Sequence, residues 1–130
     1  MIRVTTACIL AGLAILPVSV AAQQASEKWV QISVNRGVAV EADTGSVHAR
    51  GTLRIIPVRL VAPDKSRMQV MNFAIDCKAH TLGIDGDSRT YEGGKLTATD
   101  TPPADAQAQQ SPDGAPEFEK VIELACAAKL

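Results

Sequence analysis

The chain has 130 residues, with 13 lysines and arginines against 14 aspartates and glutamates. Hydrophobic residues make up 46% of it, and aromatic residues only 3%. This length favours one domain and excludes a large multidomain enzyme. A polytopic membrane protein is excluded because a single stretch is apolar enough to enter a bilayer. The near balance of charge excludes a strongly basic or acidic surface field.

Residues 1–22 have the layout of a secretory signal peptide. Arg3 supplies the positive charge of a short first region, and residues 7–16 form an uncharged apolar run. Pro17 ends that run, and Val20-Ala21-Ala22 offers small residues at the −3 and −1 positions of a cleavage site. The run is too short to span a bilayer. A buried N-terminal helix is the alternative.

We therefore expect a signal peptide at residues 1–22 and a single exported domain at residues 23–130. Cleavage near Ala22 would leave twelve basic and fourteen acidic residues and no membrane anchor. Cys8 lacks the upstream apolar residues of a lipid-attachment cysteine. The predicted location is the periplasm or the cell surface.

Two cysteines, Cys77 and Cys126, remain in the mature chain. An exported protein meets an oxidising compartment, where cysteines form disulfides. Two cysteines allow one intramolecular pairing, so we expect a Cys77–Cys126 bond. Two free thiols or an intermolecular bridge are the alternatives.

The first half of the mature chain alternates apolar and polar residues, as strands do. Residues 29–34 and 38–42 flank a short Asn/Gly turn and predict a hairpin, after which Asp43 begins a second turn. Residues 52–61 are rich in β-branched and aliphatic side chains, but contain Pro57. Proline cannot donate to a sheet ladder, so this segment is predicted to be an edge strand or to carry a bulge.

The second half continues the sheet and ends in a helix. Residues 68–77 alternate clearly, residues 78–91 more weakly, and residues 95–99 predict a last short strand. Residues 100–114 read as a loop. After it, apolar residues at helical spacing predict a helix that begins near Pro116, with Asp113 near its cap; its apolar positions are Phe118, Val121, Ile122 and Ala125.

The predicted fold class is α+β. We expect an antiparallel sheet of five to six strands, with one C-terminal helix packed on one face and one disulfide between them.

Several short segments resemble the surface-adhesin protein E-like family of Gram-negative bacteria. They are Trp29 in the opening strand, Val40-Asp43-Ser46-Val47, Ile75-Asp76-Cys77, Tyr91 before Gly94-Lys95, Pro112-Asp113-Gly114 and Leu124-Ala125-Cys126. The resemblance implies a small antiparallel sheet, one flanking helix and a helix-to-sheet disulfide. It also implies binding of host extracellular-matrix or serum proteins, but no binding residue of that adhesin can be matched here.

Candidate catalytic and metal residues are few. His48 and His80 are the only histidines, and further zinc ligands at diagnostic spacing are absent. Asp85-Gly86-Asp87 with Glu92 departs from the ligand spacing of a calcium loop, so we expect a solvated hairpin turn there. Gly86-Asp87-Ser88 is similar to the nucleophile block of one esterase class, but no histidine follows residue 80. We expect no catalytic site, metal site or cofactor.

Basic charge concentrates in the central strands at Arg50, Arg54, Arg59 and Arg67. If His48 and Arg54 share a face, that face would favour an acidic partner; a solvated outer face is the alternative. The slightly acidic mature chain makes nucleic acid an unlikely partner.

These features predict an exported binding module of the cell envelope, adhesin-like and not an enzyme. Its partner would be an envelope protein or a host extracellular protein. The alternative is a periplasmic structural or envelope-stress protein with no host ligand.

Overall fold

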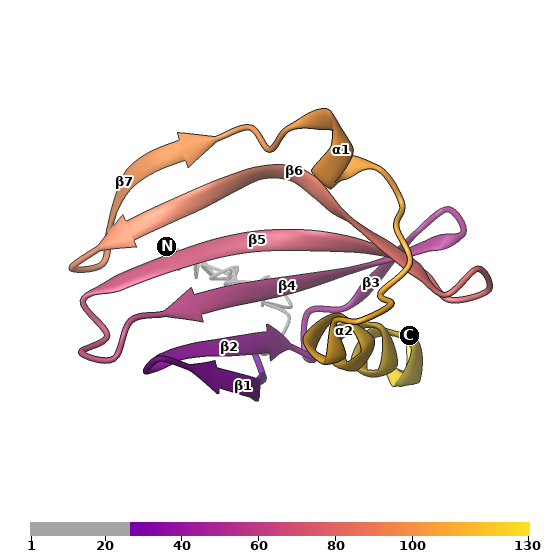
Figure 1. Cartoon of the computed structure of the whole chain (residues 1–130), viewed down its shortest axis with the longest axis horizontal. Coiled ribbons are helices and arrows are strands. Elements are labelled where there is room, and N and C mark those ends of the chain that lie inside the picture. The colour runs from indigo at the N-terminus through magenta and orange to yellow at the C-terminus, as the bar shows by residue number, and fades with distance from the viewer. Residues whose placement is uncertain (1–26) are drawn as a thin grey trace, which may run out of the picture.

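A computed structural model describes residues 27–130, and the predicted signal peptide lies outside this range. The described residues form seven strands and two helices (Figure 1). None of these helices is long and apolar enough to cross a membrane. The elements are β1 (Trp29–Asn35), β2 (Val38–Asp43), β3 (His48–Arg50), β4 (Leu53–Val61), β5 (Arg67–Asp76), β6 (Thr81–Glu92), β7 (Lys95–Asp100), α1 (Ala104–Gln107) and α2 (Pro116–Ala127).

All seven strands belong to one antiparallel sheet. Strands β1, β2, β4, β5, β6 and β7 are neighbours in that order, and the short β3 pairs with the first part of β4. The predicted antiparallel sheet with a C-terminal helix is therefore confirmed, but there are seven strands instead of five or six. The sequence does not predict β3 because three residues are too few to show an alternating pattern. Likewise, the four-residue helix α1 lies within the segment that the sequence predicts as a loop.

Pro57 lies in the interior of the sheet, at the point where β4 changes its neighbour. Residues 58–61 pair with β2 and residues 53–55 pair with β3, so Pro57 has no registered partner on that side. On its other side Pro57 faces Asn72 of β5. A residue without an N–H fits best where the ladder is already interrupted. The prediction of an edge strand or a bulge at Pro57 is thus wrong. Strand β4 has neighbours on both sides and a continuous register with β5, and the interruption lies between β2 and β3.

Strand β6 is longer than its sequence suggests, because it runs through Gly86 and both flanking aspartates. Gly86 adopts φ +71°, a backbone conformation that glycine reaches without strain. Opposite Gly86, the pairing of β6 with β5 shifts its register in the stretch from Val70 to Asn72 of β5. Such a bulge bends a sheet and increases its twist. The prediction of a solvated hairpin turn at Asp85-Gly86-Asp87 is therefore wrong.

Helix α2 packs on one face of the sheet, as its apolar spacing predicts. Val121, Ile122 and Ala125 are buried, and they join a cluster with Ile56 and Phe73 of the sheet. A helix of twelve residues is only marginally stable in water, so packing must hold it. Two details differ from the prediction. Phe118 remains 41% exposed, and the cap residue is Ala115 instead of Asp113, with no side-chain capping bond.

A disulfide between Cys77 and Cys126 fixes the last turn of α2 to the end of β5. The two cysteines are 49 positions apart. Closing a loop of that length stabilises a fold by about 4 kcal/mol, chiefly by restricting the unfolded chain. The predicted intramolecular pairing is confirmed, and such a bond indicates an oxidising compartment.

Arg54 of β4 holds the same end of α2. Its Nη1 donates to three carbonyl oxygens at the helix C-terminus, those of Ala125 (2.9 Å), Cys126 (3.2 Å) and Ala128 (2.7 Å). The last carbonyls of a helix lack partners within the helix, and they carry partial negative charge. The last turn of α2 contains no basic residue. A cation from the sheet therefore supplies both the hydrogen bonds and the charge.

We expect Arg54→Met to lower the free energy of unfolding by about 2 kcal/mol, because the carbonyls at the end of α2 would lose a charged donor while partly buried. Urea unfolding of the oxidised protein measures this. Arg67→Met is the matched control, because Arg67 makes only an exposed ion pair with Glu92 and should change stability by less than about 0.5 kcal/mol. Equal effects of the two substitutions would contradict this role of Arg54.

Candidate functional site

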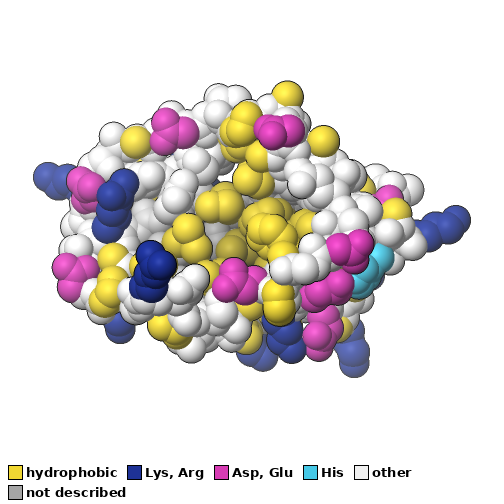
Figure 2. Space-filling view, in the orientation of Figure 1, with side chains coloured by type: hydrophobic (Ala, Val, Ile, Leu, Met, Phe, Trp, Pro, Cys, Tyr) yellow, Lys and Arg dark blue, Asp and Glu magenta, His cyan; other side chains and the backbone are white. Residues whose placement is uncertain are grey.

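An apolar groove lies on the helix-bearing face of the sheet, beside α2. It encloses about 380 Å³. Figure 2 shows it as a hollow of hydrophobic side chains surrounded by polar and charged ones. Its floor comes from four neighbouring strands, through Val40, Val58, Leu60, Met71, Phe73 and Ile84. Apolar concave sites of this size are where small molecules usually bind.

The groove exists because α2 covers only one end of this face (Figure 1). In the sheet register Leu60 lies opposite Val40 and Val58 lies opposite Met71, so these side chains share one face. Strand alternation sends every second residue of β2, β4 and β5 to that face. Beyond the reach of α2, the apolar floor continues without a covering element among the described residues.

The segment that follows α1 closes the groove on the β6 side. The N–H groups of Leu82 and Gln110 each donate to the other residue's carbonyl, at 3.0 and 2.9 Å. Gly83 makes this approach possible, since a Cβ there would lie 2.6 Å from the carbonyl oxygen of Gln107. The wall therefore depends on a glycine at position 83.

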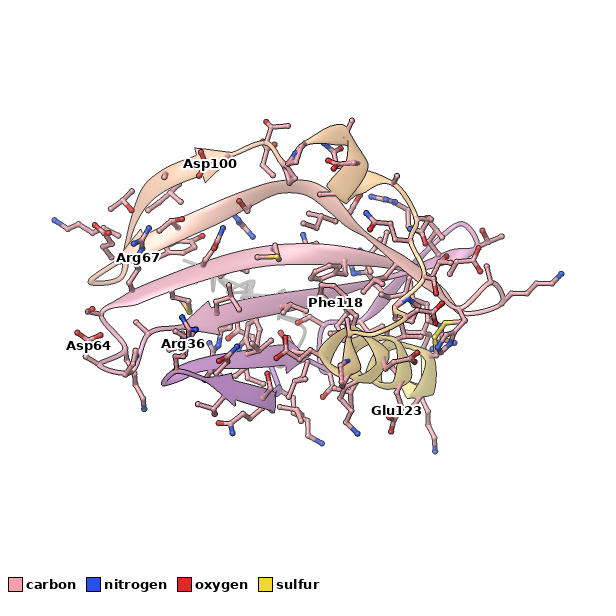
Figure 3. All side chains as sticks on the ribbon, viewed as in Figure 1. Arg36, Asp64, Arg67, Asp100, Phe118 and Glu123 are labelled. Atoms are coloured by element: carbon pink, nitrogen blue, oxygen red, sulfur yellow. A yellow bond between two sulfur atoms is a disulfide. The ribbon has the colours of Figure 1, made fainter. Side chains whose placement is uncertain are left out.

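Glu117 and Phe118 form the helix side of the groove at the first turn of α2. Glu117 accepts a hydrogen bond from the Ser33 hydroxyl of β1, at 3.0 Å between oxygens. Phe118 packs against Phe73, with 5.9 Å between ring centroids. Figure 3 shows Phe118 on the side of α2 that faces the sheet. The groove thus has an apolar floor with a carboxylate and an aromatic ring at one edge.

A second hollow, of about 320 Å³, lies on the opposite face of the sheet. Here the Arg59 guanidinium stacks over the Trp29 ring at 4.0 Å and donates to Glu41 at 3.0 Å. Arg59 and Glu41 are paired with each other, so they stabilise the sheet and leave little chemistry for a ligand. Lys65, the third charged residue of the described lining, lies exposed in the β4–β5 turn. This hollow is the weaker candidate.

The four central arginines are each engaged within the molecule. Arg54 binds the end of α2, Arg59 binds Glu41 and Arg67 lies near Glu92. Arg50 donates two hydrogen bonds to Asp85, which raises the pKa of the guanidinium. In addition, Ala49 lies opposite Arg54 and His48 lies opposite Ile55, so His48 and Arg54 are on different faces. The predicted shared face for an acidic partner is not present.

The two histidines serve different local contacts. His48 lies on β3, with Nδ1 3.3 Å from the Ser46 carbonyl oxygen. His80 lies in the β5–β6 turn, with Nε2 2.6 Å from Glu119 on α2. Within residues 27–130, no three histidine, cysteine or acidic side chains gather as metal ligands would.

The polar residues of the Asp85-Gly86-Asp87-Ser88 segment also have structural partners. Asp85 binds Arg50, and Asp87 accepts a hydrogen bond from Thr101 at 2.9 Å. Ser88 is buried, and its hydroxyl donates to the Asp100 carbonyl at 3.4 Å. These contacts connect β6 with β3 and with the end of β7, and none of them brings a histidine to Ser88.

The sequence alone does not identify the groove residues as a site. Leu60 and Met71 look like ordinary inward-facing strand residues, and Glu117 looks like a helix-favouring acid at a positive helix end. The available signal is indirect: the predicted helix offers one apolar stripe of four residues, too little to cover a sheet face of several strands.

Comparison with known proteins adds no assignment. No protein-family model matches the chain, and neither does any curated protein or solved structure.

Proposed function

We propose that this chain is an exported binding module of the cell envelope, and that its binding surface is the apolar groove beside α2. The observation that carries the proposal is the open apolar floor next to a helix that is fixed in place. Soluble proteins seldom leave a contiguous apolar surface open unless it contacts a partner or ligand. A floor built on strands is also a rigid platform, which lowers the entropic cost of binding.

Export is supported by two independent features. The disulfide is compatible with the periplasm or the extracellular space, and residues 1–22 have the layout of a secretory signal. The resemblance to the surface-adhesin protein E-like family supports the same class of protein. It transfers no binding residue, so the groove itself must define what is bound.

A binding role is favoured over catalysis by how the reactive side chains are used. The histidines contact Ser46 and Glu119, and Ser88 bonds to a backbone carbonyl. Along the groove, the lining side chains are apolar except for Gln110, Ser111 and Glu117. Such a lining suits the retention of an apolar group better than the transfer of protons or electrons.

We expect the protein recovered from its native cells to begin near Gln23 and to be oxidised at both cysteines. Intact-mass spectrometry before and after reduction measures both properties. Protease treatment of intact and permeabilised cells then distinguishes the surface from the periplasm. Recovery from the cytoplasm of a chain that retains residues 1–22, with Cys8, Cys77 and Cys126 all as free thiols, would contradict export.

We expect the purified protein to bind the neutral fluorescent probe N-phenyl-1-naphthylamine, with affinity at least tenfold lower in Leu60→Gln. Loss of about 1.5 kcal/mol of apolar contact corresponds to that factor. Leu96→Gln is the matched control, because Leu96 is 54% exposed on β7 and does not line the groove. Circular dichroism shows that each variant is folded. Equal probe binding by wild type, Leu60→Gln and Leu96→Gln would contradict the groove as the binding surface.

A further inference from the structure

We propose that the groove binds one unbranched alkyl chain of an amphiphile whose polar end is an ammonium group, with that end held by Glu117. This inference rests on the proposed function, since it names the ligand class for the same groove. Different residues determine the tail and the polar end.

The dimensions and lining of the groove favour a single alkyl chain. Its volume of about 380 Å³ is near the lower end for small-molecule sites. The floor offers aliphatic side chains and the flexible thioether of Met71, which adapts to an irregular apolar chain. No charged side chain projects from the floor strands into the groove, among the described residues that line it.

The charge at the groove edge favours a cation. Glu117 is the only ionisable residue among the described lining residues. Its Oε1 accepts the Ser33 hydroxyl, which fixes the carboxylate at the edge. An ammonium group would add a charge-assisted hydrogen bond there. A carboxylate of a bound amphiphile would instead face a like charge.

Phe118 supplies a second contact for the same cation. Phe118 is 41% exposed and follows Glu117 in the first turn of α2, and both residues line the groove. Aromatic faces attract ammonium groups within about 6 Å. The carboxylate and the ring therefore favour the same kind of polar end.

Three features of this face would favour an anion, and each is a weaker contact than Glu117. Arg67 shares the face of Met71 by strand alternation, but it lies near Glu92 and does not line the groove. The N-terminal end of α2 is positive, but Glu117 and Glu119 already lie in its first turn. Arg36 lies in the β1–β2 turn, at the end of β2 remote from α2 (Figure 3). It is not among the residues that line the groove.

The test uses decylamine, decanol and decanoate at neutral pH and about 0.15 M salt, each displacing N-phenyl-1-naphthylamine from the oxidised protein. We expect decylamine to bind about tenfold tighter than decanoate, with decanol between them. Octylamine should bind about fifteenfold more weakly than decylamine, since each buried methylene contributes about fourfold.

Glu117→Gln should abolish the preference for decylamine and leave the affinity for decanol within twofold. Glu119→Gln is the matched control, because Glu119 lies in the same helical turn but contacts His80 and does not line the groove. It should keep the full preference. Decanol binding also reports whether Glu117→Gln keeps a folded groove.

Three outcomes would overturn the inference. If the wild type binds decanoate as tightly as decylamine or more tightly, the polar end is not an ammonium group. If decanoate binding is then lost in Arg36→Gln, the anionic end lies at Arg36. Equal affinities for octylamine and decylamine would show that the groove does not bind the alkyl chain. Binding of the fluorescent probe that none of the three decyl compounds displaces would remove the ligand class and leave the proposed function standing. Failure of the probe itself to bind would instead remove the proposed function.

An ammonium-ended chain could be a free amine or a lipid of a membrane. Flotation with phosphatidylethanolamine vesicles distinguishes the two sources. If decylamine binds as expected, flotation of the wild type but not of Leu60→Gln assigns the lipid source. Absence of flotation assigns a free amphiphile, and both results support the same ligand chemistry.

Discussion

The fixed end of α2 is the constraint on which the rest of the structure depends. The Cys77–Cys126 bond and the hydrogen bonds from Arg54 act on the same last turn of the helix. Only three side chains of α2 are buried, Val121, Ile122 and Ala125. Burial contributes roughly 1.5 to 3 kcal/mol for each of the two larger ones and about 0.8 kcal/mol for the alanine methyl. That is modest for a helix that must also order its own backbone. The disulfide and the Arg54 hydrogen bonds therefore add to the apolar packing that holds the helix on the sheet.

This arrangement explains why the sheet face can remain partly open. A longer or more apolar helix could cover the face and stay in place by packing alone, but it would fill the groove. Here the anchors lie at the C-terminal end of α2, whereas Glu117 and Phe118 lie at the other end, beside the groove. The helix can thus be held firmly while its first turn contributes to a binding surface. Stability and the proposed function are placed at opposite ends of one element.

Much of the fold could be predicted from the sequence, because its signals are local. Alternation predicts β1, β2, β5 and β7, and the apolar spacing predicts α2. Asp43 accepts the N–H of Gly45, as expected of an aspartate at a turn. Pro57 leads to a wrong prediction because a proline is tolerated inside β4 only where the neighbouring strand changes. Which strands pair beside β4 is a property of the whole sheet and not of the local sequence. The groove could not be predicted for the same reason: Leu60 and Glu117 meet only through tertiary packing.

The two methionines of β5 report on opposite faces of the sheet, so they can show directly whether a ligand binds in the groove. Met71 lines the groove, whereas Met68 lines the hollow on the other face. In a spectrum of ¹³C-methyl methionine recorded during titration with N-phenyl-1-naphthylamine, binding in the groove predicts a shift of the Met71 methyl signal and an unchanged Met68 signal. A shift of Met68 alone, or saturable binding that moves neither signal, would contradict it.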